Sequence, residues 1–363
     1  MEVTTRVWRL SALLLVVVTM LAVAAIASSS TSGKEKKKPT IAQLIKQSKS
    51  ESGLIVYGNP PGRNWSTLAA KFNDKYPWIK VTEYDLEDNT IFSKYAAEAA
   101  QGSRTADMLI ASAPNLWIYA RRKGYAMDFT PIGLNRFPRY VRSFKGIYVM
   151  SPDPAVIFWN KLLLGNKKPR TVAEIANDAN TYDKVTGYTV ENTFGYTGLY
   201  GYVQLKGWSA LQKIGKRLKP TTGVATQRTL VSQGGAKVAI LSSPTIRLNI
   251  ATDSNLAKLL DWTYIHDAEP LIPRGIAITK KASSPASAKL FLDYIYSKAG
   301  QQAMCEAGFT AFMKGFKPSG GCANTVDAVY KAVGKKHVFL VSPIPKLVNA
   351  RPKFASRWHG IFG

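Results

Sequence analysis

Three hydroxyl groups and a guanidinium gather on one short stretch of this chain. Ser242, Ser243 and Thr245 follow an apolar run, and Arg247 comes two residues after them. Hydroxyls donate and accept hydrogen bonds, and a guanidinium pairs with a phosphate or a carboxylate through two parallel bonds. The alternative for Arg247 is an ordinary surface position. We therefore regard this stretch as the first candidate for binding an oxyanion.

Other neutral hydrogen-bonding side chains stand in loops that follow predicted strands. Asn59 is either a ligand contact or a turn residue. Ser112 and Asn115 could hold an oxyanion or could cap a helix, and Thr193 and Thr197 carry the same ambiguity. Because ligands of open α/β sheets lie at the carboxyl ends of the strands, we treat all five as candidate contacts.

Three aromatic residues near these loops offer a second kind of contact. Tyr196, Trp65 and Trp117 could stack on a ring of a ligand, and the alternative is that they pack in the core. Of the three, Tyr196 is counted among the candidate contacts.

The sequence lacks the motifs of familiar catalytic and metal centres. Its three histidines are scattered and form no HExxH pattern or paired spacing, and its two cysteines are too few for a zinc cluster. We find no GxSxG motif, no phosphate-binding P-loop and no credible Ser/His/Asp set. We therefore expect neither an enzyme nor a cofactor or metal site.

The net charge is strongly positive, since 49 Lys and Arg face 23 Asp and Glu, giving +26 over 363 residues. Nucleic acid, an anionic membrane or wall surface, and a pocket for small anions would each explain this excess. The only dense basic run, 34–38, is interpreted as a solvated linker. Without a recognisable nucleic-acid-binding motif, we do not expect nucleic acid as a partner.

The amino terminus has the pattern of a secretory signal. Arg6 and Arg9 precede an apolar stretch over 10–27, which ends in the small residues of Ala25-Ile26-Ala27. We predict a signal peptide over 1–27. The alternative is an uncleaved anchor, because 18 residues are near the minimum for a bilayer span. Both interpretations place the bulk of the chain outside the cytoplasm.

Export also gives a meaning to the two cysteines. Cys305 and Cys322 are 17 residues apart. Disulfides form and persist in oxidising compartments, so we predict a bond between them. Closing so short a loop contributes about 3 kcal/mol in the chain-entropy model.

Short apolar strands alternate with amphipathic helices along most of the chain. We predict strands at Leu54–Tyr57, Ile79–Thr82, Asp107–Ala111, Thr189–Val190, Val238–Leu241 and Pro273–Ile278, and helices at Ile91–Gln101 and Val203–Leu218. This alternation indicates parallel sheets with crossover helices, and the length allows about two lobes.

Five stretches, taken in order, carry a family resemblance. They are Leu54–Tyr57 with Phe72 and Tyr76–Val81; Ala106–Leu109; Trp159-Asn160 with Pro169–Thr171; Val231–Ile240; and Gly275–Ile278 with Ala288–Tyr294 and Gly300–Gln302. Their order and spacing resemble the family 1 extracytoplasmic solute-binding proteins, which capture ligands for ABC importers. The branch in question includes ferric-ion, thiamine, polyamine and phosphonate binders.

The resemblance implies an α/β, two-lobe periplasmic-binding-protein-like fold of class II, with each lobe a sheet flanked by helices and the ligand in the cleft. It also implies a monomer that meets a small-molecule ligand and an ABC permease in the membrane. The expected divisions are a basic linker and first helix (28–53), lobe one (54–148 plus 271–309), lobe two with the hinge crossovers (149–270), and a C-terminal helical tail (310–363).

One departure from the family pattern bears on the ligand. Ferric binders of this branch carry adjacent tyrosines where this chain has Ser243-Pro244-Thr245-Ile246. Acidic residues are sparse in the candidate loops apart from Glu191, which disfavours cationic solutes. We therefore expect an anionic or polyhydroxylated solute. A charge-driven surface or nucleic-acid-binding protein, or an enzyme on the same fold, remains the alternative.

Overall fold

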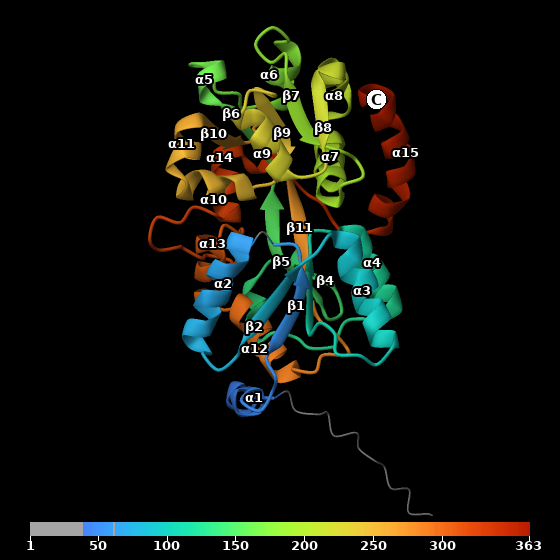
Figure 1. Ribbon diagram of the computed structural model, residues 1–363, viewed down its shortest axis with the longest axis vertical. Coiled ribbons are helices and arrows are strands. Elements are labelled where there is room, and N and C mark those ends of the chain that lie inside the picture. Colours follow the sequence, from blue (N-terminus) through green and yellow to red (C-terminus); the bar gives the residue numbers. More distant parts are fainter. Residues whose placement is uncertain (1–38, 61) are drawn as a thin grey trace, which may run out of the picture. The chain divides into compact units, whose positions relative to one another are not determined.

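The computed structural model describes residues 39–60 and 62–363 (Figure 1). The predicted signal segment 1–27 and the basic run 34–38 lie outside these residues. Within them, strands form two separate sheets of seven and five strands, each covered by helices. No helix in the described part of the chain is both long enough and apolar enough to cross a bilayer.

The first sheet has the strand order β2-β1-β3-β11-β5-β4, and β12 pairs with β11 beside this path. Its members are β1 (Leu54–Gly58), β2 (Val81–Asp85), β3 (Met108–Ala111), β4 (Arg142–Phe144), β5 (Ile147–Pro154), β11 (Glu269–Ile278) and β12 (Val338–Leu340). Strands β1, β2 and β3 are parallel, as the alternation of strands and helices predicted, whereas β11 runs antiparallel to β3 and β5.

Helices cover both faces of this sheet because its strands are apolar on both sides. Val56 of β1 packs into one core cluster and its neighbour Tyr57 into another on the opposite face. The helical elements of this region are α1 (Ile41–Ser48), α2 (Gly62–Lys75), α3 (Asp88–Ala100), α4 (Pro114–Lys123), η1 (Ile132–Arg136), η2 (Arg139–Val141), α12 (Pro285–Ile295) and α13 (Lys298–Glu306). Figure 1 shows α2 and α12 on one side of β1, with α3 and α4 on the other.

The second sheet has the order β10-β6-β9-β7-β8. Its strands are β6 (Val156–Asn160), β7 (Val185–Tyr188), β8 (Leu218–Thr221), β9 (Val238–Ser242) and β10 (Leu260–Tyr264). Its helices are α5 (Lys161–Leu164), α6 (Val172–Asn177), α7 (Thr193–Lys206), α8 (Ser209–Ile214), η3 (Gly215–Arg217), α9 (Val224–Ser232), α10 (Thr245–Thr252) and α11 (Ser254–Leu259). We call the first sheet with its helices lobe one, and the second sheet with its helices lobe two.

Two long buried strands, β5 and β11, lead from one lobe to the other (Figure 1). They pair antiparallel from Leu271 opposite Pro154, with a register shift between Arg274 and Gly275. Gly275 is required at this shift, because an added Cβ would stand 2.1 Å from the indole nitrogen of Trp117. The backbone next to Arg274 is therefore fixed by close packing against α4.

The C-terminal segment is only partly helical, which differs from the expected helical tail. It contains α14 (Val326–Val333), η4 (Lys335–His337), the strand β12 and α15 (Pro345–Phe362). Strand β12 joins the first sheet, whereas α15 buries Leu347, Phe354 and Trp358 in the core of lobe two. The predicted bond between Cys305 and Cys322 is present.

Some predicted boundaries were wrong, and the reasons are local. Strand β2 spans Val81–Asp85 rather than Ile79–Thr82, because Ile79 packs into the core as the turn after α2 closes. The predicted strand Thr189–Val190 follows β7 rather than forming it. The helix expected over Val203–Leu218 is divided at Gly207, whose φ of 68° ends α7.

Candidate functional site

A cavity of about 450 Å³ is lined by loops from both lobes. From lobe one it receives the ends of β1, β2 and β3, and from lobe two the starts of α9 and α10. The carboxyl ends of parallel strands and the helices that begin there are the ordinary ligand-binding positions of open α/β sheets. The cavity is therefore the candidate site.

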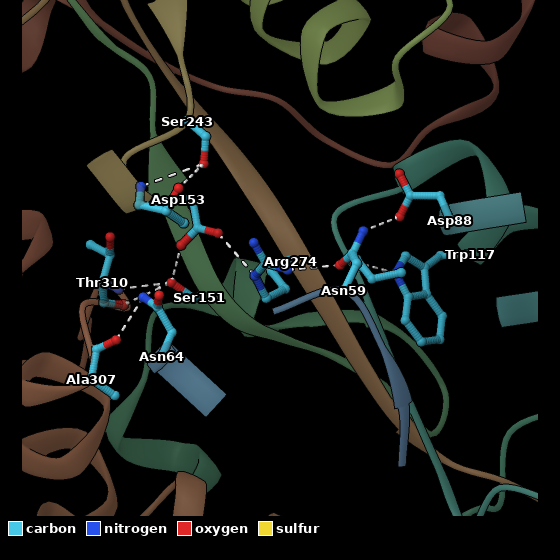
Figure 2. Close-up of polar contacts among 12 residues, drawn as sticks. Asn59, Asn64, Asp88, Trp117, Ser151, Asp153, Ser243, Arg274, Ala307 and Thr310 are labelled. Atoms are coloured by element: carbon cyan, nitrogen blue, oxygen red, sulfur yellow. Dashed lines mark hydrogen bonds and ion pairs between the residues drawn. The ribbon is translucent and has the colours of Figure 1, made fainter. Parts of the chain in front are cut away.

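Arg274 on β11 holds the centre of the polar contacts around this cavity (Figure 2). Its Nε donates to Asp153 Oδ2 at 3.0 Å, and its Nη1 donates to Asn59 Oδ1 at 2.8 Å. Asn59 in turn donates from its amide nitrogen to Asp88. The other terminal nitrogen, Nη2, makes no hydrogen bond to the described residues and is available to a guest in the cavity.

The ion pair between Arg274 and Asp153 is buried, with side chains 5% and 2% exposed. Asp153 also accepts from the hydroxyl of Ser151, which itself accepts from the backbone N–H of Thr310 at 2.8 Å (Figure 2). Buried charges need opposite charges and hydrogen bonds, and here both carboxylate oxygens of Asp153 and two of the three guanidinium nitrogens of Arg274 have them. These contacts fix the guanidinium in one position before any ligand arrives.

Ser112 lines the same cavity and has an unsatisfied hydroxyl. It is 3% exposed, and its Oγ has no hydrogen-bond partner among the described residues. It precedes α4, a ten-residue helix whose N-terminal turn is not capped by a side chain. Uncapped N–H groups and the positive end of a helix dipole favour an anion. Ser112 lies next to the strand pair that joins Ala111 to Gly275, beside Arg274.

Lobe two supplies hydroxyls from the loop after β9. Ser243 and Thr245 line the cavity and their hydroxyl oxygens are 3.1 Å apart. Leu241, at the end of β9, has a φ of 50°, a left-handed conformation that costs a non-glycine residue about 1 kcal/mol. Leu241 lies where the pairing of β9 with β6 is irregular, two residues before Ser243.

Three carboxylates line the cavity from lobe one. Asp85 ends β2, and Glu87 and Asp88 begin α3. Burial raises the pKa of Asp88 to about 6, although the charge of Arg274 opposes the shift and the hydroxyl of Thr193 also hydrogen-bonds to this carboxylate. Burial likewise raises the pKa of Asp85. The candidate loops predicted from the sequence are poor in acidic residues, but the loop after β2, which was not among them, supplies these three carboxylates.

The structure brings four predicted contacts to the cavity: Asn59, Ser112, Ser243 and Thr245. They come from the ends of β1, β3 and β9. A fifth predicted residue, Thr193, lies near the cavity. It is buried beside Asp88 but does not line the cavity.

Four other predicted contacts lie elsewhere. Asn115 stands half-buried in the first turn of α4, away from the cavity lining. Thr197 donates to the carbonyl of Thr193 within α7, Tyr196 donates to the carbonyl of Leu347, and Ser242 donates to the side chain of Gln227. The polar groups of these three are buried and hydrogen-bonded within the protein.

Arg247 does not line the cavity either. It is buried outside the cavity lining, where it donates to the Pro244 carbonyl and to the Tyr264 hydroxyl at 2.9 Å. Trp65 and Trp117 pack in the core, the alternative stated for both.

The residues that were missed are Arg274 and the three carboxylates. A charged residue followed by glycine inside an apolar strand, as in Arg274-Gly275, is a signal of close backbone approach that could have been noticed. The carboxylates were missed because β2 was predicted to end too early, so the loop after it was not counted among the strand ends.

Comparison with known proteins places the chain in a family. Residues 67–328 match the family described as bacterial extracellular solute-binding protein, so the chain belongs to this family of binding proteins and is not an enzyme. Membership implies a location outside the cytoplasm, and proteins of this kind bind small molecules and a membrane permease. No curated protein sequence matches the chain.

Solved structures agree on the fold. The substrate-binding protein of an ABC transporter from Agrobacterium tumefaciens is 20% identical, with a TM-score of 0.73 over 85% of this chain and 95% of that chain. AfuA from Actinobacillus pleuropneumoniae, with fructose-6-phosphate bound, is 16% identical with a TM-score of 0.67 over 85% and 98%. Iron-bound HitA from Pseudomonas aeruginosa is 15% identical with a TM-score of 0.65 over 85% and 99%. The two-lobe periplasmic-binding-protein fold is thereby confirmed.

Proposed function

We propose that this protein captures a small polar solute bearing an anionic group in the cleft between its lobes and delivers it to an ABC importer. The observation that carries the proposal is that one cavity is lined by Ser112, whose buried Oγ has no partner, and by Arg274, which uses only Nε and Nη1 in hydrogen bonds to the described residues. A buried hydroxyl without a partner costs free energy in the empty protein, and a ligand oxygen would remove that cost.

The size and lining of the cavity support a polar solute of modest size. Its volume of about 450 Å³ falls in the range of small-molecule sites. Polar groups come from both lobes, so that one bound molecule would touch both and favour the closed arrangement. Binding that favours one of two arrangements shifts their populations in proportion to the difference in affinity.

A ferric ion is not the solute we favour. In the loop after β9, Ser243 and Thr245 line the cavity where ferric binders of the resembled branch carry tyrosines. The described residues also contain no group of three or more His, Cys, Asp or Glu side chains arranged to hold a metal ion. A sugar phosphate, of the kind bound by AfuA, fits the hydroxyl-rich lining better.

The test begins with the solute that the protein carries. Native mass spectrometry of protein purified from its own host should show a bound mass with an anionic group. Titration of that solute into Arg274→Lys should show affinity reduced about tenfold or more, because an ammonium cannot hold Asp153, Asn59 and the ligand at once.

Arg247→Lys is the matched control, because Arg247 is equally buried but does not line the cavity. Its affinity for the solute should equal that of the unmodified protein. Equal loss in both variants, or no carried solute and no binding, would contradict the proposed function.

A further inference from the structure

The cavity has an acidic wall, which we define as Asp85, Glu87 and Asp88. These three side chains come from the end of β2 and the start of α3, on the lobe-one side. Ser112 and Arg274 line the same cavity from the ends of other strands. One compartment therefore contains both an anion-binding group of donors and a set of carboxylates.

The charges lining this cavity do not balance. Arg274 is the one cationic side chain among the described residues that line it, and its Nε is already paired with Asp153. None of the acidic-wall residues forms an ion pair with the described residues. Asp88 has only neutral hydrogen-bond partners, the amide of Asn59 and the hydroxyl of Thr193. The wall thus presents carboxylates without a matching cation.

The neighbouring residue Glu83 shows how unfavourable this excess of carboxylates is for an ionised group. Behind the wall on β2, burial and the charge of Asp85 raise the pKa of Glu83 to about 8, and its Oε1 is buried without a partner. In the wall itself Asp85 and Glu87 are exposed and Asp88 is half-buried. A carboxylate next to other carboxylates is harder to ionise, and a cation placed beside it favours the ionised form. A positively charged group in the cavity would therefore be stabilised by the wall.

We propose that the solute is bipolar: it presents an ammonium group to the acidic wall while its oxyanion lies on Ser112 and Arg274. The inference rests on the proposed function and names the class of solute more closely. A simple anion would face three unpaired carboxylates, and a simple polyamine would leave the Ser112 hydroxyl and the free Arg274 nitrogen unused. A solute with both charges satisfies both groups through charge-assisted hydrogen bonds.

The test uses two probes that differ in one group. Glucosamine 6-phosphate and glucose 6-phosphate share the phosphate but carry an ammonium or a hydroxyl on the same ring carbon. Calorimetry at pH 7 should show the amine probe binding about tenfold more tightly. Asp85→Asn should abolish the difference, whereas Asp74→Asn, which alters an exposed carboxylate of α2, should preserve it.

The number of protons released or taken up on binding gives a second measurement of the contact between the ammonium group and the acidic wall. Arg274, Glu87, Asn59 and Thr193 face Asp88, whose pKa of about 6 would fall when a cation binds nearby. Titrations at pH 6 in two buffers of different ionisation enthalpy should therefore show proton release with the amine probe. Glucose 6-phosphate should release fewer protons, because the phosphate, which titrates near pH 6, is common to both probes and only the ammonium lowers the pKa of Asp88.

The failure of this inference can be told apart from the failure of solute capture. Equal or weaker binding of the amine probe, binding of neither probe, or a carried solute without a basic nitrogen would each overturn the bipolar assignment. In the last case the carried solute would still support the proposed function. Absence of any carried solute together with absence of any probe binding would overturn both.

Discussion

At the scale of single residues, the site depends on polar groups that the empty protein leaves unused or strained. Ser112 lacks a partner, Arg274 keeps one nitrogen free, and Leu241 holds a left-handed backbone conformation. Features of this kind reduce stability and persist where they serve binding.

Ser112→Ala separates stability from binding. Removing a buried hydroxyl without a partner should leave the free energy of unfolding unchanged or raise it by up to about 1 kcal/mol, while ligand affinity falls about tenfold. Chemical denaturation and calorimetry measure the two quantities. Ser284→Ala is the control, because its Oγ is also buried without a partner but lies outside the cavity. Equal affinity losses in the two variants would remove Ser112 from the site.

Glu83 predicts a pH dependence of stability. Its pKa in the folded protein is about 8, above the ordinary value of 4.5, so its contribution is fully present below about pH 4.5 and is lost as pH rises through 8. Denaturation at pH 5, 7 and 9 should show stability falling with pH less steeply in Glu83→Gln than in the unmodified protein. Glu87→Gln, an exposed position, should keep the original slope, and identical slopes in all three proteins would refute the assignment.

At the scale of elements, β11 positions the site because it carries Arg274 through the region where both lobes meet. The register shift at Gly275 and the indole of Trp117 hold this strand against α4. The Trp117 indole also donates to the carbonyl of Ala111 at 2.9 Å, which ties α4 to the end of β3. Arg274 and Ser112 are therefore kept in place by one packed unit.

Gly275→Ala should disrupt the packing of β11 against α4. Its Cβ would overlap the Trp117 indole, so we expect a loss of about 2 kcal/mol or more in the free energy of unfolding and weaker ligand binding. Gly198→Ala is the control inside α7, where the new Cβ would approach only a side-chain methyl of Ile272 at 3.4 Å. The control should be neutral or more stable by up to about 1 kcal/mol. Similar destabilisation of both variants, measured by chemical denaturation, would refute the packing argument.

Element types were more predictable than element ends. The apolar runs of β1, β3 and β9 are bounded by glycine, proline and serine, and these strands were identified from the sequence. The end of β2 was not, because the polar residues Glu83 and Asp85 on this edge strand give no apolar alternation. Because the end of β2 was predicted wrongly, the acidic wall was not identified from the sequence.

At the scale of the whole molecule, sequence order indicated the two-lobe fold, but not which side chains meet in its cleft. Arg247 lies in α10 and Arg274 lies in β11, and only the pairing of β11 with β3 and β5 brings Arg274 to the cavity. Contacts between strands so far apart in the sequence depend on tertiary packing. Local patterns therefore predicted four of the cavity contacts, whereas the guanidinium and the carboxylates required the structure.

The central claim is that one solute touches both lobes and draws them together. Small-angle X-ray scattering of the protein, first stripped of its carried solute and then saturated with it, tests this claim most directly. We predict a smaller radius of gyration in the saturated protein. An unchanged radius at saturating solute, with binding verified in the same sample, would contradict the account.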